Sequence, residues 1–401
     1  MFLLYVFGLL ALVSAYVGLR LLPALPLGPL SLGAAVAVLC LPVGLALATL
    51  LARRFGGSAL ARRFGWAASL TLGWVTLLLV LTLLREPVLA LADWLAPAAV
   101  AHATQADSAL AVPTLAALAT LLGVFSALRP RLVEVSIPLP GLPLDLRGFS
   151  ILQLSDVHIG RTIRRRFVER LVARCNALHP DLVAITGDLV DGSVAELAAQ
   201  VAPLARLRAR HGTWFVTGNH EYYSGAAEWI VELRRLGMHV LLNEHAVLRH
   251  GAAELIIAGV TDTSAHAFDP FQRSDPQRAL QGAPAQLRPR ILLAHRPRSA
   301  PAAAQAGFDV QLSGHTHGGQ FWPWNLVVRY QEPLRTGLDR LERLWVYTSR
   351  GTGFWGPPLR LGVPAEITRV RLVAAGAAQA HAKQGTGPAR PAEGGGRRAA
   401  P

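Results

Sequence analysis

The sequence predicts a mixed α/β protein in which two packed mixed β-sheets are flanked by helices and preceded by an all-α bundle of four transmembrane helices. Three observations lead to this prediction. Apolar residues are concentrated before residue 130. From Phe149 onward, short apolar runs typical of strands alternate with stretches of helical spacing. Several of these runs end on Asp, Asn or His, which places polar chemistry at the ends of strands.

The first 130 residues contain four apolar segments long enough to cross a bilayer. Of the 401 residues, 52% are apolar and 16% charged, and the mean hydropathy is +0.36. This composition is too apolar for an ordinary soluble enzyme. A spanning helix needs about 20 residues, and no basic residues precede the first apolar run, so we expect a retained helix there rather than a cleaved signal peptide. The expected spans are Met1–Leu19, Ser31–Leu51, Trp66–Leu84 and Leu110–Leu128.

Charge around these spans predicts their orientation. Four arginines (Arg53, Arg54, Arg62 and Arg63) lie between the second and third spans, whereas the loop expected from Arg85 to Asp107 carries three acids. The positive-inside rule places the arginine loop in the cytoplasm. The rest of the chain then also lies in the cytoplasm, anchored to a bacterial inner membrane. Only Arg20, near a span end, is charged within the expected spans, so they are expected to be an anchor and not a transport pathway.

The net charge of +14 is spread along the whole chain. It suits an anionic membrane surface and an anionic substrate, and does not single out a specific nucleic acid. The two cysteines, Cys40 and Cys175, fall in different halves, so no disulfide within one domain is expected. We expect a transmembrane anchor over residues 1–131, a linker over 132–146, a catalytic domain over 147–373 and a disordered tail over 374–401.

The second half is expected to supply at least eight strands with helices between them. The expected strands are Phe149–Leu154, Leu182–Thr186, Trp214–Thr217, Leu255–Val260, Ile291–Ala294, Val310–Leu312, Leu344–Thr348 and Ile367–Val373, and the expected helices are Ile163–Leu178, Val194–Ala209 and Ala226–Leu236. So many strands exceed one doubly wound sheet, which favours two packed sheets.

Five of these strands deliver metal-binding side chains at their carboxyl ends, where ligands gather in open α/β sheets. The side chains are Asp156, His158, Asp188, Asn219, His295, His315 and His317. Carboxylate and imidazole donors together suit Mn, Fe or Zn better than Mg or Ca. Two such cations about 3.5–4 Å apart can clamp the attacking and leaving oxygens of a phosphate ester during hydrolysis. The pattern therefore predicts a phosphoesterase that uses two divalent metal ions.

Five motifs, in order, resemble the signature of the calcineurin-like metallophosphoesterase superfamily and its bacterial membrane-anchored phosphodiesterase branch. The motifs are Asp156-Val157-His158, Gly187-Asp188-Leu189-Val190-Asp191-Gly192, Gly218-Asn219-His220-Glu221, Ala294-His295 and Gly314-His315-Thr316-His317. The resemblance implies the four-layer sandwich of that superfamily over residues 147–373.

The resemblance also implies a role for each residue. Asp156, His158 and His317 would hold the first metal, Asn219, His295 and His315 the second, and Asp188 would bridge both. His220 would be the catalytic residue that protonates the leaving oxygen or steadies the transition state. A metal-bound hydroxide would be the nucleophile.

Two neighbouring features admit more than one interpretation. Asp191 could contact an imidazole beside the metals, but a cap for the turn before Ser193 is the preferred interpretation. The aromatic run Phe321-Trp322-Pro323-Trp324 suits a membrane interface, with core packing as the alternative.

The predicted function is a phosphodiesterase or pyrophosphatase that hydrolyses a phosphate ester at the membrane surface, with lipid-linked and nucleotide-linked phosphates as candidate substrates. The alternative is a non-catalytic membrane receptor or scaffold with a structural metal site.

Overall fold

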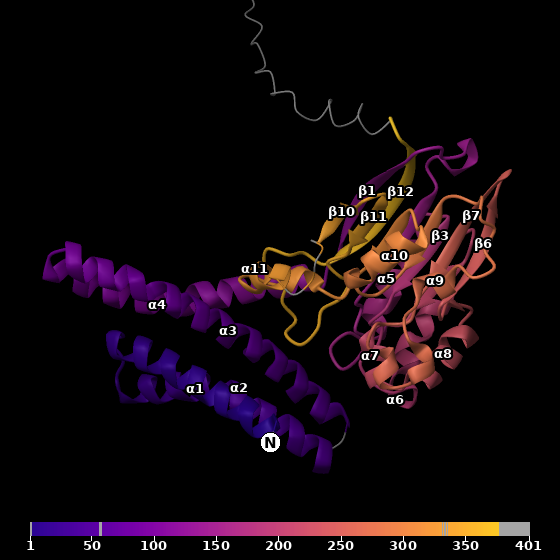
Figure 1. Cartoon of the computed structure of the whole chain (residues 1–401). Coiled ribbons are helices and arrows are strands. Elements are labelled where there is room, and N and C mark those ends of the chain that lie inside the picture. The colour runs from indigo at the N-terminus through magenta and orange to yellow at the C-terminus, as the bar shows by residue number, and fades with distance from the viewer. Residues whose placement is uncertain (1, 56–57, 331, 333, 335, 377–401) are drawn as a thin grey trace, which may run out of the picture.

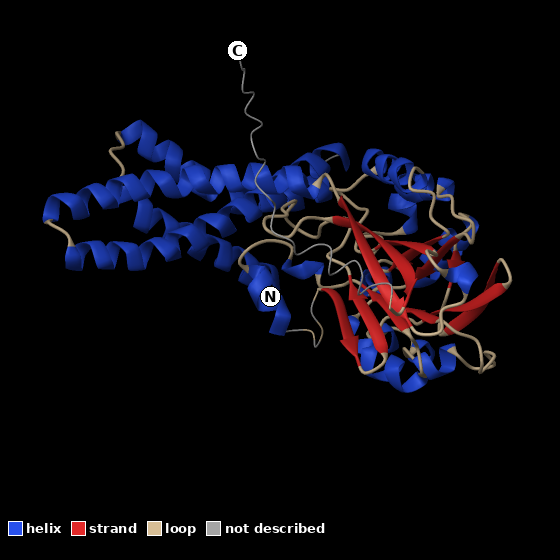
Figure 2. Cartoon of the chain, turned by 90° about the horizontal axis from the view of Figure 1, so that it is seen from above, coloured by secondary structure: helices blue, strands red, loops and turns tan. Residues whose placement is uncertain are grey.

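The computed structural model of the chain describes residues 2–376 except 56–57, 331, 333 and 335. It shows a bundle of long helices beside a domain with two β-sheets (Figures 1 and 2). Most of the segment 374–401, predicted as a disordered tail, lies outside the described residues. Its first residue, Ala374, ends the last strand.

Four apolar helices precede the sheet domain: α1 (Phe2–Leu21), α2 (Pro29–Phe55), α3 (Ser58–Leu95) and α4 (Ala98–Ala127). Four stretches are long and apolar enough to cross a membrane, namely Tyr5–Ala24, which runs three residues beyond α1, and Pro29–Ala52, Arg63–Leu95 and Ala98–Ala127, which lie within α2, α3 and α4. Many of their large apolar side chains are exposed, as expected of surfaces that face lipid. The four long apolar helices that the sequence predicted are therefore present.

The sequence predicted a loop from Arg85 to Asp107. This prediction is wrong, because α3 continues to Leu95 and α4 begins at Ala98. Two charged residues in this region, Arg85 and Glu86, have partners within the bundle. Arg85 is buried and donates hydrogen bonds to Ser108 Oγ, Gln105 O and Arg20 O, and Glu86 pairs with Arg20. These partners let charged residues continue an apolar helix. The third span of the structure is longer than the expected Trp66–Leu84, and it therefore contains Arg85 and Glu86.

The second half of the chain forms two six-stranded mixed sheets, which confirms the predicted fold class. The first has the order β1-β12-β2-β3-β4-β5 and the second β10-β11-β9-β8-β7-β6. The strands of the first sheet are β1 (Arg131–Leu139), β2 (Ser150–Leu154), β3 (Leu182–Thr186), β4 (Thr213–Val216), β5 (His239–Val240) and β12 (Glu366–Ala374). Those of the second are β6 (Glu244–His250), β7 (Ala253–Gly259), β8 (Arg290–Leu293), β9 (Val310–Ser313), β10 (Gly337–Leu341) and β11 (Leu344–Thr348).

Parallel pairing brings the strand ends that carry the motifs to common edges. In the first sheet, β2, β3 and β4 are parallel neighbours, and in the second, β8 and β9 are parallel neighbours. Because these five strands are short and almost wholly buried, their polar residues begin where the strands stop.

The sheets pack face to face and helices cover their outer faces. Apolar side chains from both sheets, such as Ile151, Leu182, Ile257 and Leu312, form the central core. Outside the first sheet lie α5 (Arg165–Asn176), α6 (Val194–Val201) and α8 (Ala226–Arg235), and outside the second lie α9 (Pro276–Ala279) and α10 (Ala300–Ala306). Helix, sheet, sheet and helix therefore form four layers.

Strand β1 begins at Arg131 and occupies the first part of the segment 132–146, for which the sequence predicted a linker. It pairs with β12 in parallel over nine residues, from Arg131 to Leu139. This pairing requires β12, more than 200 residues further along the chain, and such a distant partner is not visible in a local pattern.

Candidate metal centre

The backbone turns sharply where each motif leaves its strand. Nine described residues other than glycine have a positive φ, and five of them are predicted metal ligands: Asp156, His158, Asp188, His315 and His317. A left-handed conformation costs a residue with a Cβ on the order of 1–3 kcal/mol and persists where the surroundings enforce it. Here it aims side chains from neighbouring strands toward one point.

Two glycines let these turns approach one another. A Cβ on Gly218 would lie 2.2 Å from Asp188 Oδ1, and a Cβ on Gly314 would lie 2.2 Å from Asp156 Oδ2. No side chain fits at such distances. The glycine that precedes Asn219 and the one that precedes His315 are therefore geometric requirements of the site.

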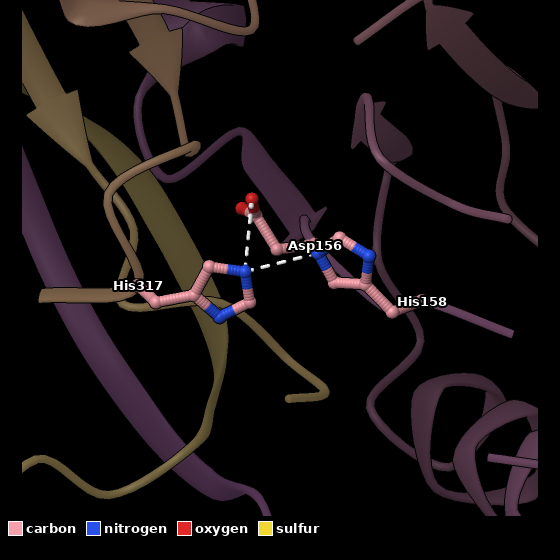
Figure 3. Close-up of side chains that lie close together, drawn as sticks. All are labelled: Asp156, His158 and His317. Carbon is pink, nitrogen blue, oxygen red and sulfur yellow. Dashed lines mark hydrogen bonds and ion pairs between the residues drawn. The ribbon is translucent and has the colours of Figure 1, made fainter. Parts of the chain in front are cut away.

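A first group of donors consists of Asp156, His158 and His317, which come from the ends of β2 and β9 (Figure 3). One donor atom from each lies within 4.8 Å of the others. The two Nε2 atoms of His158 and His317 are 3.0 Å apart, and His317 Nε2 is 3.6 Å from Asp156 Oδ1. All three side chains are buried.

A second group consists of Asp188, His295 and His315, again with donor atoms within 4.8 Å of one another. His295 Nε2 is 3.2 Å from both Asp188 Oδ2 and His315 Nδ1. Asn219 begins the short helix α7 (Asn219–Tyr223). Its Oδ1 is buried and accepts no hydrogen bond from the described residues.

Asp188 lies between the two groups. Its Oδ2 is 3.2 Å from His295 Nε2 in the second group and 4.0 Å from His158 Nε2 in the first. Its Oδ1 accepts a hydrogen bond from the backbone N–H of His220 at 2.9 Å. This bond holds the carboxylate with one oxygen directed at both groups.

Asp191 contacts two imidazoles, so the preference for a turn cap is corrected. Its Oδ1 accepts hydrogen bonds from His158 Nδ1 at 3.0 Å and from His220 Nδ1 at 2.7 Å. The two rings flank one carboxylate because α7 brings His220 beside the β2 turn. With Nδ1 donating, His220 keeps Nε2 free to face the pocket.

Two buried charged residues at the site were not predicted. Glu221 accepts hydrogen bonds from the backbone N–H groups of Asp188, Leu189, Val190 and Gly218, which ties the β3 turn to the β4 turn. Glu221 belongs to a quoted motif, so its position was a usable signal. Arg360 lies outside every motif, yet its Nη2 donates to His317 Nδ1 at 2.9 Å.

The donors of the site shift one another's pKa values in both directions. Burial would lower the pKa of His295, but the charge of Asp188 and its hydrogen bond raise it to about 10. Burial would raise the pKa of Asp188, yet His295 holds it well below its usual value. By contrast, burial and the neighbouring His295 lower the pKa of His315 to about 2.

The residues fit divalent metal ions. His158 and His295 each donate through Nδ1, to Asp191 and to Thr186 O respectively, so each directs Nε2 inward as a donor for a metal. The proton of a neutral His317 faces His158 from Nε2, since Arg360 donates to Nδ1, and a bound cation would replace that proton. The orphaned Asn219 Oδ1 supplies a further oxygen.

A pocket of about 520 Å³ opens over these donors. The lining includes His220, Tyr223, Trp355, Arg298 and Glu332, together with five of the predicted ligands. Arg298 pairs with Glu332 at 2.7 Å. Pockets of this size hold a small organic ligand, so the site has room for more than a phosphate group.

The run Phe321-Trp322-Pro323-Trp324 meets the membrane helices at one end. Phe321 is buried in an apolar cluster with residues of α1, α3 and α4. Trp324, at the start of α11 (Trp324–Val327), is 47% exposed. The first residue of the run is therefore packed in an apolar core, whereas the last residue is exposed.

The fold and its donor set define a metallophosphoesterase, and comparison with known proteins agrees. The sequence profile of the calcineurin-like phosphoesterase family matches residues 149–319. An uncharacterized metallophosphoesterase from Aquifex aeolicus is 32% identical over 260 residues, covering 64% of this chain and 97% of that protein. The chain therefore belongs to the calcineurin-like phosphoesterase family, a family of phosphoric ester hydrolases.

Another relative is named as a transmembrane protein. A "transmembrane protein with metallophosphoesterase domain" from Danio rerio is 38% identical over 282 residues, covering 68% of this chain and 64% of that protein. The chain thus spans just under two thirds of that relative. A putative 5'-nucleotidase from Staphylococcus aureus is 15% identical, covers 56% of this chain and 54% of its own, and superimposes with a TM-score of 0.37, too distant to bear on function.

Proposed function

We propose that the chain hydrolyses a phosphate ester, of the phosphodiester or pyrophosphate type, with two divalent metal ions. The observation that carries this is the convergence of two donor groups on one carboxylate, Asp188. One ion would be held by Asp156, His158 and His317. The other ion would be held by Asn219, His295 and His315, and Asp188 would contact both ions. The ions, Mn, Fe or Zn by their donors, would polarise the phosphoryl group and activate water.

The residues of the chain supply the remaining functions. Asp191 accepts a hydrogen bond from Nδ1 of His220, which lines the pocket, so the imidazolium form of His220 would carry a second proton on Nε2 and can donate it to the leaving oxygen. A pocket of about 520 Å³ supports a substrate with organic groups on the phosphate rather than phosphate alone. A lipid-linked or nucleotide-linked phosphate meets this requirement, and the membrane helices favour hydrolysis at the membrane surface.

An assay with Asp188→Asn tests the proposal. Purified wild-type protein in detergent with Mn²⁺ should hydrolyse bis(p-nitrophenyl) phosphate, lose this activity in EDTA and regain it when Mn²⁺ is restored. Loss of a residue beside a metal ligand costs 10–100-fold, so Asp188→Asn, which replaces the charged carboxylate proposed to hold both ions by a neutral amide, should lower kcat by about 100-fold or more. Equal turnover by wild type and variant would reject the proposal. Metal binding without turnover of any ester would favour the receptor or scaffold alternative.

A further inference from the structure

A loop of the catalytic domain, Trp355–Leu361, inserts a side chain between the membrane helices. Leu359 is completely buried and packs in the apolar cluster with Val75 and Leu78 of α3 and Ala116 of α4. Phe321, just after the last ligand motif, belongs to the same cluster. The helix bundle and the metal-binding domain thus share one apolar core at this point.

Two helix glycines make room for Leu359. A Cβ on Gly73 of α3 would lie 2.3 Å from Leu359 Cδ1 and 3.0 Å from Pro357 Cβ, and a Cβ on Gly123 of α4 would lie 3.1 Å from Leu359 Cδ2. The backbone N–H of Arg360 donates to the carbonyl of Gly123 at 3.0 Å. The loop is therefore held to α4 by a hydrogen bond and to both helices by close packing.

The residue after Leu359 contacts a predicted metal ligand. The Arg360 guanidinium is buried and donates to three backbone carbonyls: Gly353 O at 3.1 Å from Nε, and His317 O at 2.9 Å and Arg350 O at 2.7 Å from Nη1. Its Nη2 donates to His317 Nδ1 at 2.9 Å. These bonds fix the guanidinium, which in turn fixes the plane of the His317 ring.

The same loop is tied to the backbone that carries His317. Gln320 Nε2 donates to Trp355 O and Pro357 O, both at 2.9 Å, and Gln320 Oε1 accepts from Trp355 N–H at 2.8 Å. The N–H of Trp322 donates to Leu361 O at 3.0 Å. Hydrogen bonds therefore join the loop directly to the segment that carries His317, and Trp355 also lines the pocket.

We propose that helices α3 and α4 position the ligand His317 through Leu359 and Arg360, so that the membrane bundle is a structural part of the metal centre. Arg360 is a positioning residue in this arrangement. The inference rests on the proposed metal centre. Its physical basis is that metal ligands must be held within fractions of an ångström, and displacement of a supporting residue weakens metal binding 10–100-fold.

Gly73→Ala tests this coupling from the membrane side, far from any ligand. The added methyl would displace Leu359 and the loop that contains it, and the dissociation constant for Mn²⁺ should rise about tenfold. Full-length protein in detergent is titrated with Mn²⁺, and free Mn²⁺ is followed by electron paramagnetic resonance. The matched control is Gly44→Ala in α2, where a Cβ meets nothing within 4 Å, and this control should bind like wild type.

A second substitution distinguishes displacement of the loop from general damage to the bundle. Leu359→Ala added to Gly73→Ala removes the collision, so the double variant should bind Mn²⁺ more tightly than Gly73→Ala alone. Circular dichroism in EDTA reports whether each variant is folded without metal. If Gly73→Ala does not fold, Arg360→Lys is measured instead and should also weaken Mn²⁺ binding about tenfold, because Lys cannot bond the three carbonyls and the ring together.

The outcomes separate this inference from the proposed function. Wild-type protein that binds no Mn²⁺ overturns the metal centre itself. Wild-type protein that binds Mn²⁺, with folded Gly73→Ala or Arg360→Lys equal to it, overturns the coupling and leaves the metal centre intact. A double variant no better than Gly73→Ala would also count against displacement of Leu359 as the cause.

Discussion

Asp191 shows how one carboxylate sets the chemistry of two rings. It holds His158 with Nε2 directed at the metal ligands and His220 with Nε2 directed into the pocket. Burial would raise the pKa of Asp191, but His158 and His220 hold it far below its usual value. The carboxylate therefore stays charged, and both rings keep the same orientation, throughout the neutral and mildly acidic range.

We expect Asp191→Ala to lower both Mn²⁺ affinity and kcat by about 10–100-fold, the usual cost of losing an outer partner of a metal site. Asp191→Asn retains an acceptor oxygen and should recover part of both losses.

The stability that Asp191 contributes should depend on pH. The pKa of Asp191 is lower in the folded protein than in the unfolded chain, where it is about 3.9. Asp191 therefore stabilises the fold above about pH 3.9, and this contribution disappears as the pH falls through the lower folded pKa. Denaturant unfolding should thus show wild type and Asp191→Ala converging only below about pH 4. A constant difference down to pH 2 would contradict this account.

At the scale of elements, the site depends on strands that stop together and turn tightly. Five strands from two sheets end at the same place, and left-handed residues just beyond them direct side chains inward. Short strands alone do not achieve this. Glycines between the strand ends remove the atoms that would hold neighbouring turns apart.

Gly218→Ala should disrupt the site by this mechanism. Its Cβ would lie 2.5 Å from the backbone N of Asp188, an atom that cannot move aside as a flexible side chain could. We expect the Mn²⁺ dissociation constant to rise about 100-fold and the free energy of unfolding to fall by about 1–3 kcal/mol, the usual cost of overpacking.

Gly237→Ala is the control for this substitution. Gly237 has a φ of 86° and open space around its Cα, so alanine there costs about 1–2 kcal/mol of left-handed strain but leaves the metal site unchanged. Metal content and chemical denaturation of both variants provide the measurement. Normal Mn²⁺ binding by Gly218→Ala would show that the β3 and β4 turns can separate without harm.

At the scale of the whole molecule, the catalytic domain packs against the four N-terminal helices. Phe321 and Leu359 enter the apolar core of the helices, and α4 leads directly into β1. Since α3 and α4 are consecutive helices that pack against each other, the end of α2 and the start of α3, which carry arginines at 53, 54, 62 and 63, lie at the same end of the bundle as the start of the catalytic domain. We infer that both face the cytoplasm of a bacterial cell.

Protease digestion tests this orientation. In intact spheroplasts of a bacterial host, the catalytic domain should resist added protease, and it should be cleaved after the membrane is disrupted. A periplasmic protein and a cytoplasmic protein serve as controls for access. Cleavage of the catalytic domain in intact spheroplasts would place it on the opposite side of the inner membrane.

The sequence by itself determined the four apolar helices, the alternation of strands and helices, and the set of residues able to bind metal. These are local properties, because hydrophobic periodicity and residue type can be recognised from a few consecutive residues. Strands such as Leu182–Thr186 and Leu344–Thr348 were predicted with the bounds that the structure shows.

Only the tertiary structure decided which distant residues meet. Strand β1 needs β12 as its partner, Asp191 needs two rings from separate turns, and Arg360 reaches His317 through a loop held by the membrane helices. The length of α3 beyond Leu84 depended in the same way on partners that Arg85 and Glu86 find in other helices. Such contacts arise from three-dimensional packing between residues far apart in the chain, so no local pattern records them.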